Sequence, residues 1–165
     1  MKALVVIRLL AVYNKSQNKG GWRTIKEIYP VTVHLTTSMT MGQETEHFEF
    51  TEHGQLIRLN GGQIYLRYLE HQDQQATPVQ FRFDEERVQL DRRGPRQTRL
   101  IFEEGAATTT RYQTEYGVIH LVVETRQLIK KLDFTAHQGT LQAVYRLKNQ
   151  GQILGTYRIQ LQFAP

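Results

Sequence analysis

The 165-residue chain contains no cysteine, and this absence excludes several classes of protein at once. It leaves no disulfide framework, no thiolate metal site and no cysteine nucleophile, and it suits a reducing cytoplasm.

Long apolar runs are also missing. The longest spans residues 3–13, is interrupted by Arg8, and is far shorter than the ~20 residues of a membrane-spanning helix. We therefore expect no membrane attachment.

Recognisable catalytic and metal-binding patterns are missing as well. None of the six histidines pairs with another at ligand spacing on one helix, and most fall on the outward side of a predicted strand. The acidic pairs Glu85–Glu86 and Glu103–Glu104 lie in predicted turns, where solvation explains them. The Gly61–Gly62 pair indicates a hairpin, because no helix follows it to bind phosphate. The sequence predicts no enzyme, no metal and no cofactor.

A basic surface is also absent from most of the chain, although the formal net charge is +5. Residues 1–30 hold six basic side chains and one acidic side chain, which accounts for the whole excess. The other 135 residues hold fifteen of each sign. Nucleic-acid binding usually requires a basic face on the folded domain, so we expect no nucleic-acid partner.

The first 27 residues differ in composition from the rest and are predicted to be an N-terminal extension. An apolar run is followed by a polar, glycine-ended stretch at residues 14–21 that is typical of a linker. The extension is expected to be weakly ordered or to add an edge element, a strand or a helix, to the main domain. Residues 28–165 have the length of one domain, which buries ~70% of the surface its unfolded chain exposes.

The stretch from Thr108 to Thr125 shows most clearly how that domain is built. Up to Tyr116 the even positions share one face of a strand, whereas from Ile119 the apolar side chains occupy odd positions. A side chain changes face at every residue, so the switch requires a turn or bulge, and Gly117 permits one. We predict two antiparallel strands joined near Gly117.

The same period-2 alternation recurs from residue 28 to residue 163, with turn residues at short intervals. Turns are expected at residues 52–54 and 61–62, and the polar residues 71–78 are expected to form a loop. Short connections imply antiparallel neighbours. An apolar face and two sheet edges are hidden together when the sheet closes. The prediction is an all-β, up-and-down antiparallel barrel of roughly ten strands, with a β-sandwich as the alternative.

The order and spacing of these residues resemble the YwiB-like family of small bacterial proteins of unknown function. The matching positions are Tyr65, Leu66, Tyr68, Glu70, Arg93, Gly94, Phe102, Tyr112, Thr114, Tyr116, Gly117, Leu121, Thr125, Tyr145, Leu147 and Gly155. The resemblance covers residues 31–163 and leaves out the N-terminal extension. It implies a calycin-like, lipocalin-type barrel in the cytoplasm of a low-GC Gram-positive bacterium. It implies no activity, because the family has none assigned.

A barrel of this size can leave part of its interior unfilled, so the inward hydroxyls become candidate ligand contacts. They are Tyr68, Thr110, Tyr112, Thr114, Tyr145 and Tyr157. Alternatively, these hydroxyls pair with one another, with water or with the backbone. Arg93, beside a predicted turn at a barrel end, can bind a carboxylate or phosphate, or pair with Glu103 or Glu104.

These residues support two hypotheses about function. The first is a non-enzymatic barrel, monomer or homodimer, that binds a small apolar or amphipathic ligand in its interior. The second is a protein-interaction or assembly module that uses the outer barrel surface and has a packed interior.

Overall fold

The computed structural model describes residues 25–94 and 97–165, which form ten strands and no helix. The strands are β1 (Ile25–Met41), β2 (Glu44–Leu59), β3 (Ile64–Gln72), β4 (Gln75–Phe83), β5 (Arg87–Arg93), β6 (Gln97–Glu103), β7 (Ala107–Thr114), β8 (Gly117–Asp133), β9 (Gln138–Asn149) and β10 (Gln152–Ala164). Since the described residues contain no helix, none of them offers a helical membrane span.

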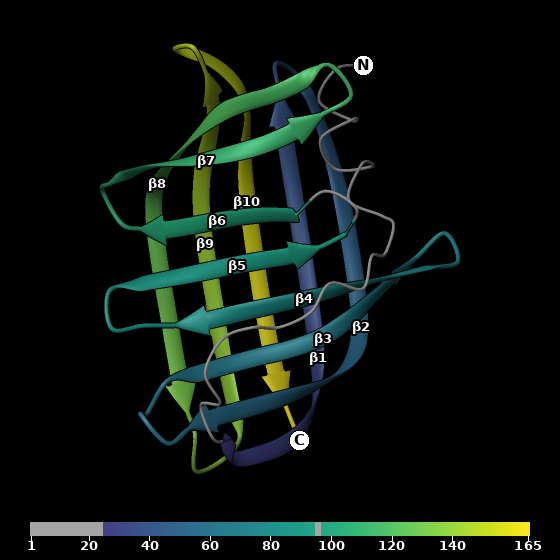
Figure 1. The fold of residues 1–165 in the computed structure, drawn as a ribbon, viewed down its shortest axis with the longest axis vertical. Helices are drawn as coiled ribbons and strands as arrows, with labels where there is room; N and C mark the ends of the chain where they lie inside the picture. Colours follow the sequence, from purple (N-terminus) through teal and green to yellow (C-terminus); the bar gives the residue numbers. More distant parts are fainter. Residues whose placement is uncertain (1–24, 95–96) are drawn as a thin grey trace.

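The strands form a single antiparallel sheet in which β1 pairs with β10, so the first and last strands of the meander meet. The sheet curls into a nearly closed barrel and does not split into two separate sheets. In Figure 1, strands β1, β8, β9 and β10 run along the long axis, and β3 to β7 cross them on the near side. The predicted up-and-down barrel is confirmed.

The hairpin around Gly117 has the predicted form. β7 and β8 pair from Ala107↔Glu124 to Thr114↔Gly117, and Gly117 has a φ of 120°. Tyr112 points inward from β7, and Leu121 and Val123 point inward from β8, so the apolar face does change parity at the turn. Tyr116 lies at the tip of the turn and is 97% exposed.

Of two predicted breaks in the strands, one is absent and the other is much shorter than expected. The turn expected at residues 52–54 lies inside β2, where Gly54 pairs with Val31 on one side and Tyr68 on the other. A side chain there would approach Val33 Cγ2 to 2.8 Å, so glycine serves close strand contact. The loop expected at residues 71–78 is a hairpin whose turn is only Asp73 and Gln74.

The boundary of the N-terminal extension also differs from the prediction. β1 begins at Ile25, so residues 25–27 belong to the barrel. Arg58 Nε of β2 donates to the Glu27 carboxylate and ties this start to its neighbour. Residues 1–24, which carry the rest of the predicted extension, lie outside the described residues, as do Pro95 and Arg96 of the predicted turn after Arg93.

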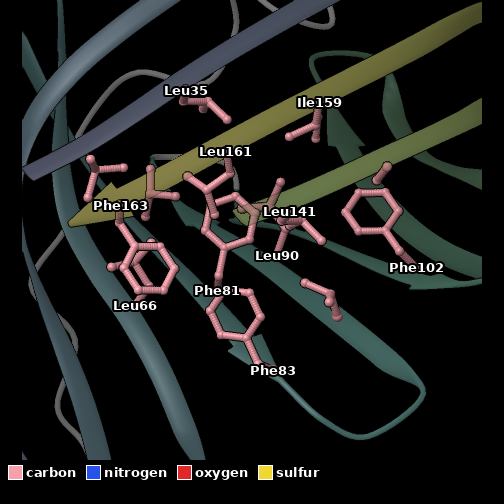
Figure 2. Close-up of a cluster of buried hydrophobic side chains, with 14 of the residues drawn as sticks. Leu35, Leu66, Phe81, Phe83, Leu90, Phe102, Leu141, Ile159, Leu161 and Phe163 are labelled. Carbon is pink, nitrogen blue, oxygen red and sulfur yellow. The ribbon is translucent and has the colours of Figure 1, made fainter. Parts of the chain in front are cut away.

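One half of the interior is closely packed (Figure 2). Phe81, Phe83 and Phe163 lie beside leucines from strands on both sides of the barrel, with ring centroids 6.2–6.3 Å apart along the series. Phe81, Leu66 and Phe163 are at most 1% exposed. Burying side chains of this size contributes roughly 1.5–3 kcal/mol each. This packed half holds the barrel together.

The barrel is incomplete between β6 and β7, which follow one another in the chain but share no hydrogen-bonded ladder among the described residues. The turn between them is attached to β8 instead, because Gly105 N donates to Thr125 O at 3.0 Å and Thr125 N to Ala106 O at 3.1 Å. Thr108 Oγ1 still donates to Ile101 O at 2.8 Å beside the turn. We call this gap between β6 and β7 the seam.

Candidate functional site

The other half of the interior is hollow and holds a cavity of about 280 Å³. All ten strands contribute to its wall. The lining residues are Thr37, Phe48, Phe50, Glu70, Gln72, Asp73, Gln75, Thr77, Leu90, Arg92, Thr98, Leu100, Tyr112, Leu121, Tyr145, Leu147, Tyr157 and Ile159. Gln72, Asp73 and Gln75 are exposed, so the cavity reaches the surface beside the β3–β4 turn.

Most of this wall is apolar or aromatic. The rings of Tyr145 and Tyr157, on neighbouring strands, stack with centroids 5.1 Å apart at an interplanar angle of 9°. Phe102 packs on the Tyr145 ring at 4.7 Å and fixes it from behind. Rigid stacked rings of this kind offer a flat surface to an apolar or aromatic body.

A buried ion pair forms the polar part of the wall. Arg92 Nη1 donates to Glu70 Oε1 at 2.5 Å, joining β5 to β3 across β4. Their side chains are 17% and 4% exposed, so Arg92 faces the cavity more than Glu70 does. Both residues follow the inward parity of their strands, Arg92 after Val88 and Leu90, and Glu70 after Leu66 and Tyr68.

The ion pair and the tyrosines perturb one another. Burial is the largest single influence on Arg92 and lowers its pKa, but the Glu70 carboxylate together with Tyr68 and Tyr145 more than offsets it, so that the pKa lies above its usual value. Burial, and then Glu70, raises the pKa of Tyr68 far above 10. Burial raises the pKa of Tyr157 to about 12, and burial together with Tyr157 raises that of Tyr145 further. The phenols are therefore neutral at physiological pH.

Three hydroxyls around the cavity lack hydrogen-bond partners within the described part of the chain. They belong to Thr98, Tyr112 and Tyr157, and each oxygen is buried. A buried polar group without a partner costs about 1–3 kcal/mol, so most native hydroxyls of this kind are paired. These three border one cavity, whereas the Tyr68 and Thr125 hydroxyls, which also lack partners among the described residues, do not line it.

The structure brings together only part of the predicted site. Tyr112, Tyr145 and Tyr157 line the cavity as expected, whereas Tyr68 is buried outside the wall, beside Glu70 and stacked on Phe81 at 6.5 Å. Thr110 faces the seam rather than the cavity. Thr114 does not line the cavity either, because its hydroxyl donates to Gly117 O at 2.8 Å within the hairpin turn.

The arginine of the site is Arg92, and Arg93 is not part of it. Arg93 is exposed on the opposite parity of β5, opposite Gln97. The acids proposed as its partners are engaged elsewhere, Glu103 with Arg87 at 2.6 Å and Glu104 with the backbone N–H of Leu128. Period-2 counting from Val88 reaches Arg92, so the parity of β5 was the signal that pointed to the arginine lining the cavity.

The described residues contain no group of three or more histidine, aspartate and glutamate side chains able to hold a metal ion. The cavity wall combines the Arg92–Glu70 ion pair with hydroxyls and aromatic rings. Such a combination of polar and apolar groups is suited to holding a molecule in one orientation.

The fold and the cavity define a class of protein, the ten-stranded antiparallel barrel with an amphipathic interior cavity. Residues 33–161 match a family described as a domain of unknown function, DUF1934, and the chain belongs to that family. The crystal structure of the YwiB protein from Bacillus subtilis is similar, with a TM-score of 0.73 and 21% identity over 85% of this chain and 94% of that one. The predicted YwiB-like membership is thereby confirmed. A comparison with curated proteins found no match.

Proposed function

We propose that this protein is a non-enzymatic binding protein that holds a small amphipathic molecule in the hollow half of its barrel. The observation that carries the proposal is the combination, around one cavity, of stacked aromatic rings, a buried Arg92–Glu70 pair and three unpartnered hydroxyls. A ligand with an apolar body and a polar end supplies the missing hydrogen bonds and covers the aromatic faces. The cysteine-free sequence supports a cytoplasmic location for this activity.

A second candidate function is supported by the seam. The edges of β6 and β7 that face it carry no ladder, and a cleft of about 380 Å³ lies on the outside between them, lined by residues such as Arg99, Thr109 and Arg111. Unpaired strand edges are templates for an added strand, so the outer face at the seam is the surface on which a protein-interaction module would act. The hollow interior favours ligand binding over this alternative, which was expected to have a packed interior.

The test of the first proposal is to fill the cavity without altering the outer face. Thr37 lines the cavity, whereas Thr36, the preceding residue on β1, faces outward. N-Phenyl-1-naphthylamine, an uncharged fluorophore that brightens in apolar surroundings, serves as the probe. We expect the wild type and Thr36→Phe to enhance its fluorescence, and Thr37→Phe to bind it at least ~10-fold more weakly.

The fold of both variants is checked by circular dichroism and thermal unfolding. Equal binding by a folded Thr37→Phe and the wild type would show that the fluorophore sits elsewhere and would contradict the proposal. Absence of any enhancement with the wild type would contradict it as well.

A further inference from the structure

The charges around the cavity bear on what kind of polar end its ligand carries, an inference that rests on the proposed function. A lone arginine in an apolar cavity is suited to a carboxylate or phosphate. Here Arg92 is not alone, because Glu70, almost completely buried, already binds its Nη1. The pair is neutral as a unit before any ligand arrives.

The remaining ionisable group of the wall adds a negative charge. Among the lining residues Arg92 is the only cation, while Glu70 and Asp73 are both acidic, so the formal charge of the wall is −1. Tyr145 and Tyr157 add no charge, since burial raises the pKa of each and keeps the phenol protonated. An anion entering this space loses its hydration and meets a guanidinium whose charge is compensated, beside a second carboxylate at the mouth.

An uncharged acceptor meets no such cost. Within the described chain, the Arg92 side chain hydrogen-bonds to Glu70, and 17% of that side chain remains exposed where it lines the cavity. A guanidinium carries five N–H donors and no acceptor, so its free donors suit an oxygen acceptor on the ligand. The Thr98, Tyr112 and Tyr157 hydroxyls can each donate or accept, and suit a polar end that does both.

We propose that the cavity selects an uncharged ligand whose polar end is a carboxamide-type group, and that it discriminates against the corresponding carboxylate. The carbonyl oxygen accepts from Arg92, and the amide N–H donates to a wall hydroxyl. Glu70 is a positioning residue that orients Arg92 and cancels its charge. The ring faces of Tyr145 and Tyr157 hold the apolar body.

The experiment compares two probes with one body, 4-phenylbutanamide and 4-phenylbutanoate, by isothermal titration calorimetry at pH 7.5. With the wild type we expect the amide to bind at least ~10-fold more tightly than the carboxylate. Asp73→Asn removes the negative charge in the exposed turn at the cavity mouth. We expect it to lower the ratio of amide affinity to carboxylate affinity about 2- to 3-fold. Glu49→Gln, which removes an exposed charge from the outer face of β2, is the matched control and should leave the ratio unchanged.

Glu70→Gln leaves Arg92 without its counter-ion and is expected to reverse the preference, so that the carboxylate binds more tightly than the amide. Its fold is checked by circular dichroism, and Asp73→Asn keeps the test decisive if Glu70→Gln unfolds. Tighter binding of the carboxylate by the wild type would overturn this inference alone. Failure of both probes to bind, with the fluorophore also giving no signal, would overturn the proposed function and this inference together.

Discussion

At the scale of single residues, the molecule places phenols where charge is strongly disfavoured. Tyr145 and Tyr157 are 4% and 3% exposed, and burial is the largest cause of the raised pKa in both. The two rings stack on each other, and the Tyr157 hydroxyl has no hydrogen-bond partner among the described residues. Tyrosine is useful here because one side chain supplies an apolar face and a polar atom.

These raised pKa values predict a loss of stability in alkali. The unfolded chain releases a tyrosine proton near pH 10, whereas Tyr157 in the folded state keeps it to about pH 12. The stabilisation by the neutral phenol is complete below pH 10 and is lost as the pH rises through about 12. The expected slope is about 1 kcal/mol per pH unit for each such group.

Urea unfolding at several pH values between 9 and 12 measures this slope, with Tyr157→Phe as the comparison. The phenylalanine keeps the ring stack and has no proton to release, so the variant should lose less stability than the wild type across that range. Parallel curves for the two proteins would contradict the prediction.

At the scale of elements, the two-residue turns show how hairpins form without the expected residues. Asp73 and Gln74 have φ values of 50° and 62°, and Gln150 and Gly151 have 51° and 78°. Positive φ at both central positions is the type I′ geometry that matches the twist of paired strands. The β9–β10 turn has glycine at its second position, whereas the β3–β4 turn places a glutamine there.

Gln74→Gly should therefore stabilise the protein. Glycine adopts the left-handed conformation without the cost that a Cβ atom imposes, and we expect a gain of about 0.5–1 kcal/mol in the free energy of unfolding. Chemical denaturation measures the change. Gln75→Gly, one residue into β4, is the control and should destabilise by a similar amount because glycine weakens a strand. A Gln74→Gly variant less stable than the wild type would show that the side chain itself contributes more than the turn geometry.

At the scale of the whole molecule, the barrel closes between two strands that are distant in the sequence and is open between two that are consecutive. The strands farthest apart in sequence, β1 and β10, form a continuous ladder from Thr32↔Ala164 to Thr40↔Thr156. The consecutive strands β6 and β7 part at the seam. The barrel is therefore held by its packed half and its long strands, and is weakest where its shortest strands meet the hollow half.

Hydrogen exchange should reveal this difference. Amides in the β5–β6 ladder lie next to an unpaired edge and require only local opening, whereas those in the β1–β10 ladder require much larger opening. We expect the former to exchange on the order of 100-fold faster, measured by exchange mass spectrometry or NMR. The β9–β10 ladder, also interior to the sheet, is the control and should match β1–β10. Uniform protection around the barrel would contradict the seam as a weak point.

The alternation of apolar and polar residues along the chain predicted the strands and their faces, because successive side chains of a strand point to opposite faces. Tyr112, Tyr145 and Tyr157 were found in this way, and the parity of β5 also points to Arg92. The turns were harder to place. Polar composition at residues 71–78 indicated a loop, yet residues on both sides of Asp73 and Gln74 complete a ladder, since pairing with a neighbouring strand overrides local propensity.

The sequence by itself determined that this protein is a meander of antiparallel strands with one apolar face, because period-2 patterning and turn residues act over a few positions of the chain. Only the tertiary structure decided that β1 pairs with β10, that β6 and β7 part, and that Arg92 meets Glu70, 22 residues away, inside a half-empty barrel. Those features depend on how the sheet curls and on which side chains fill its interior. They are set by contacts between distant residues, and alternation carries no information about such contacts.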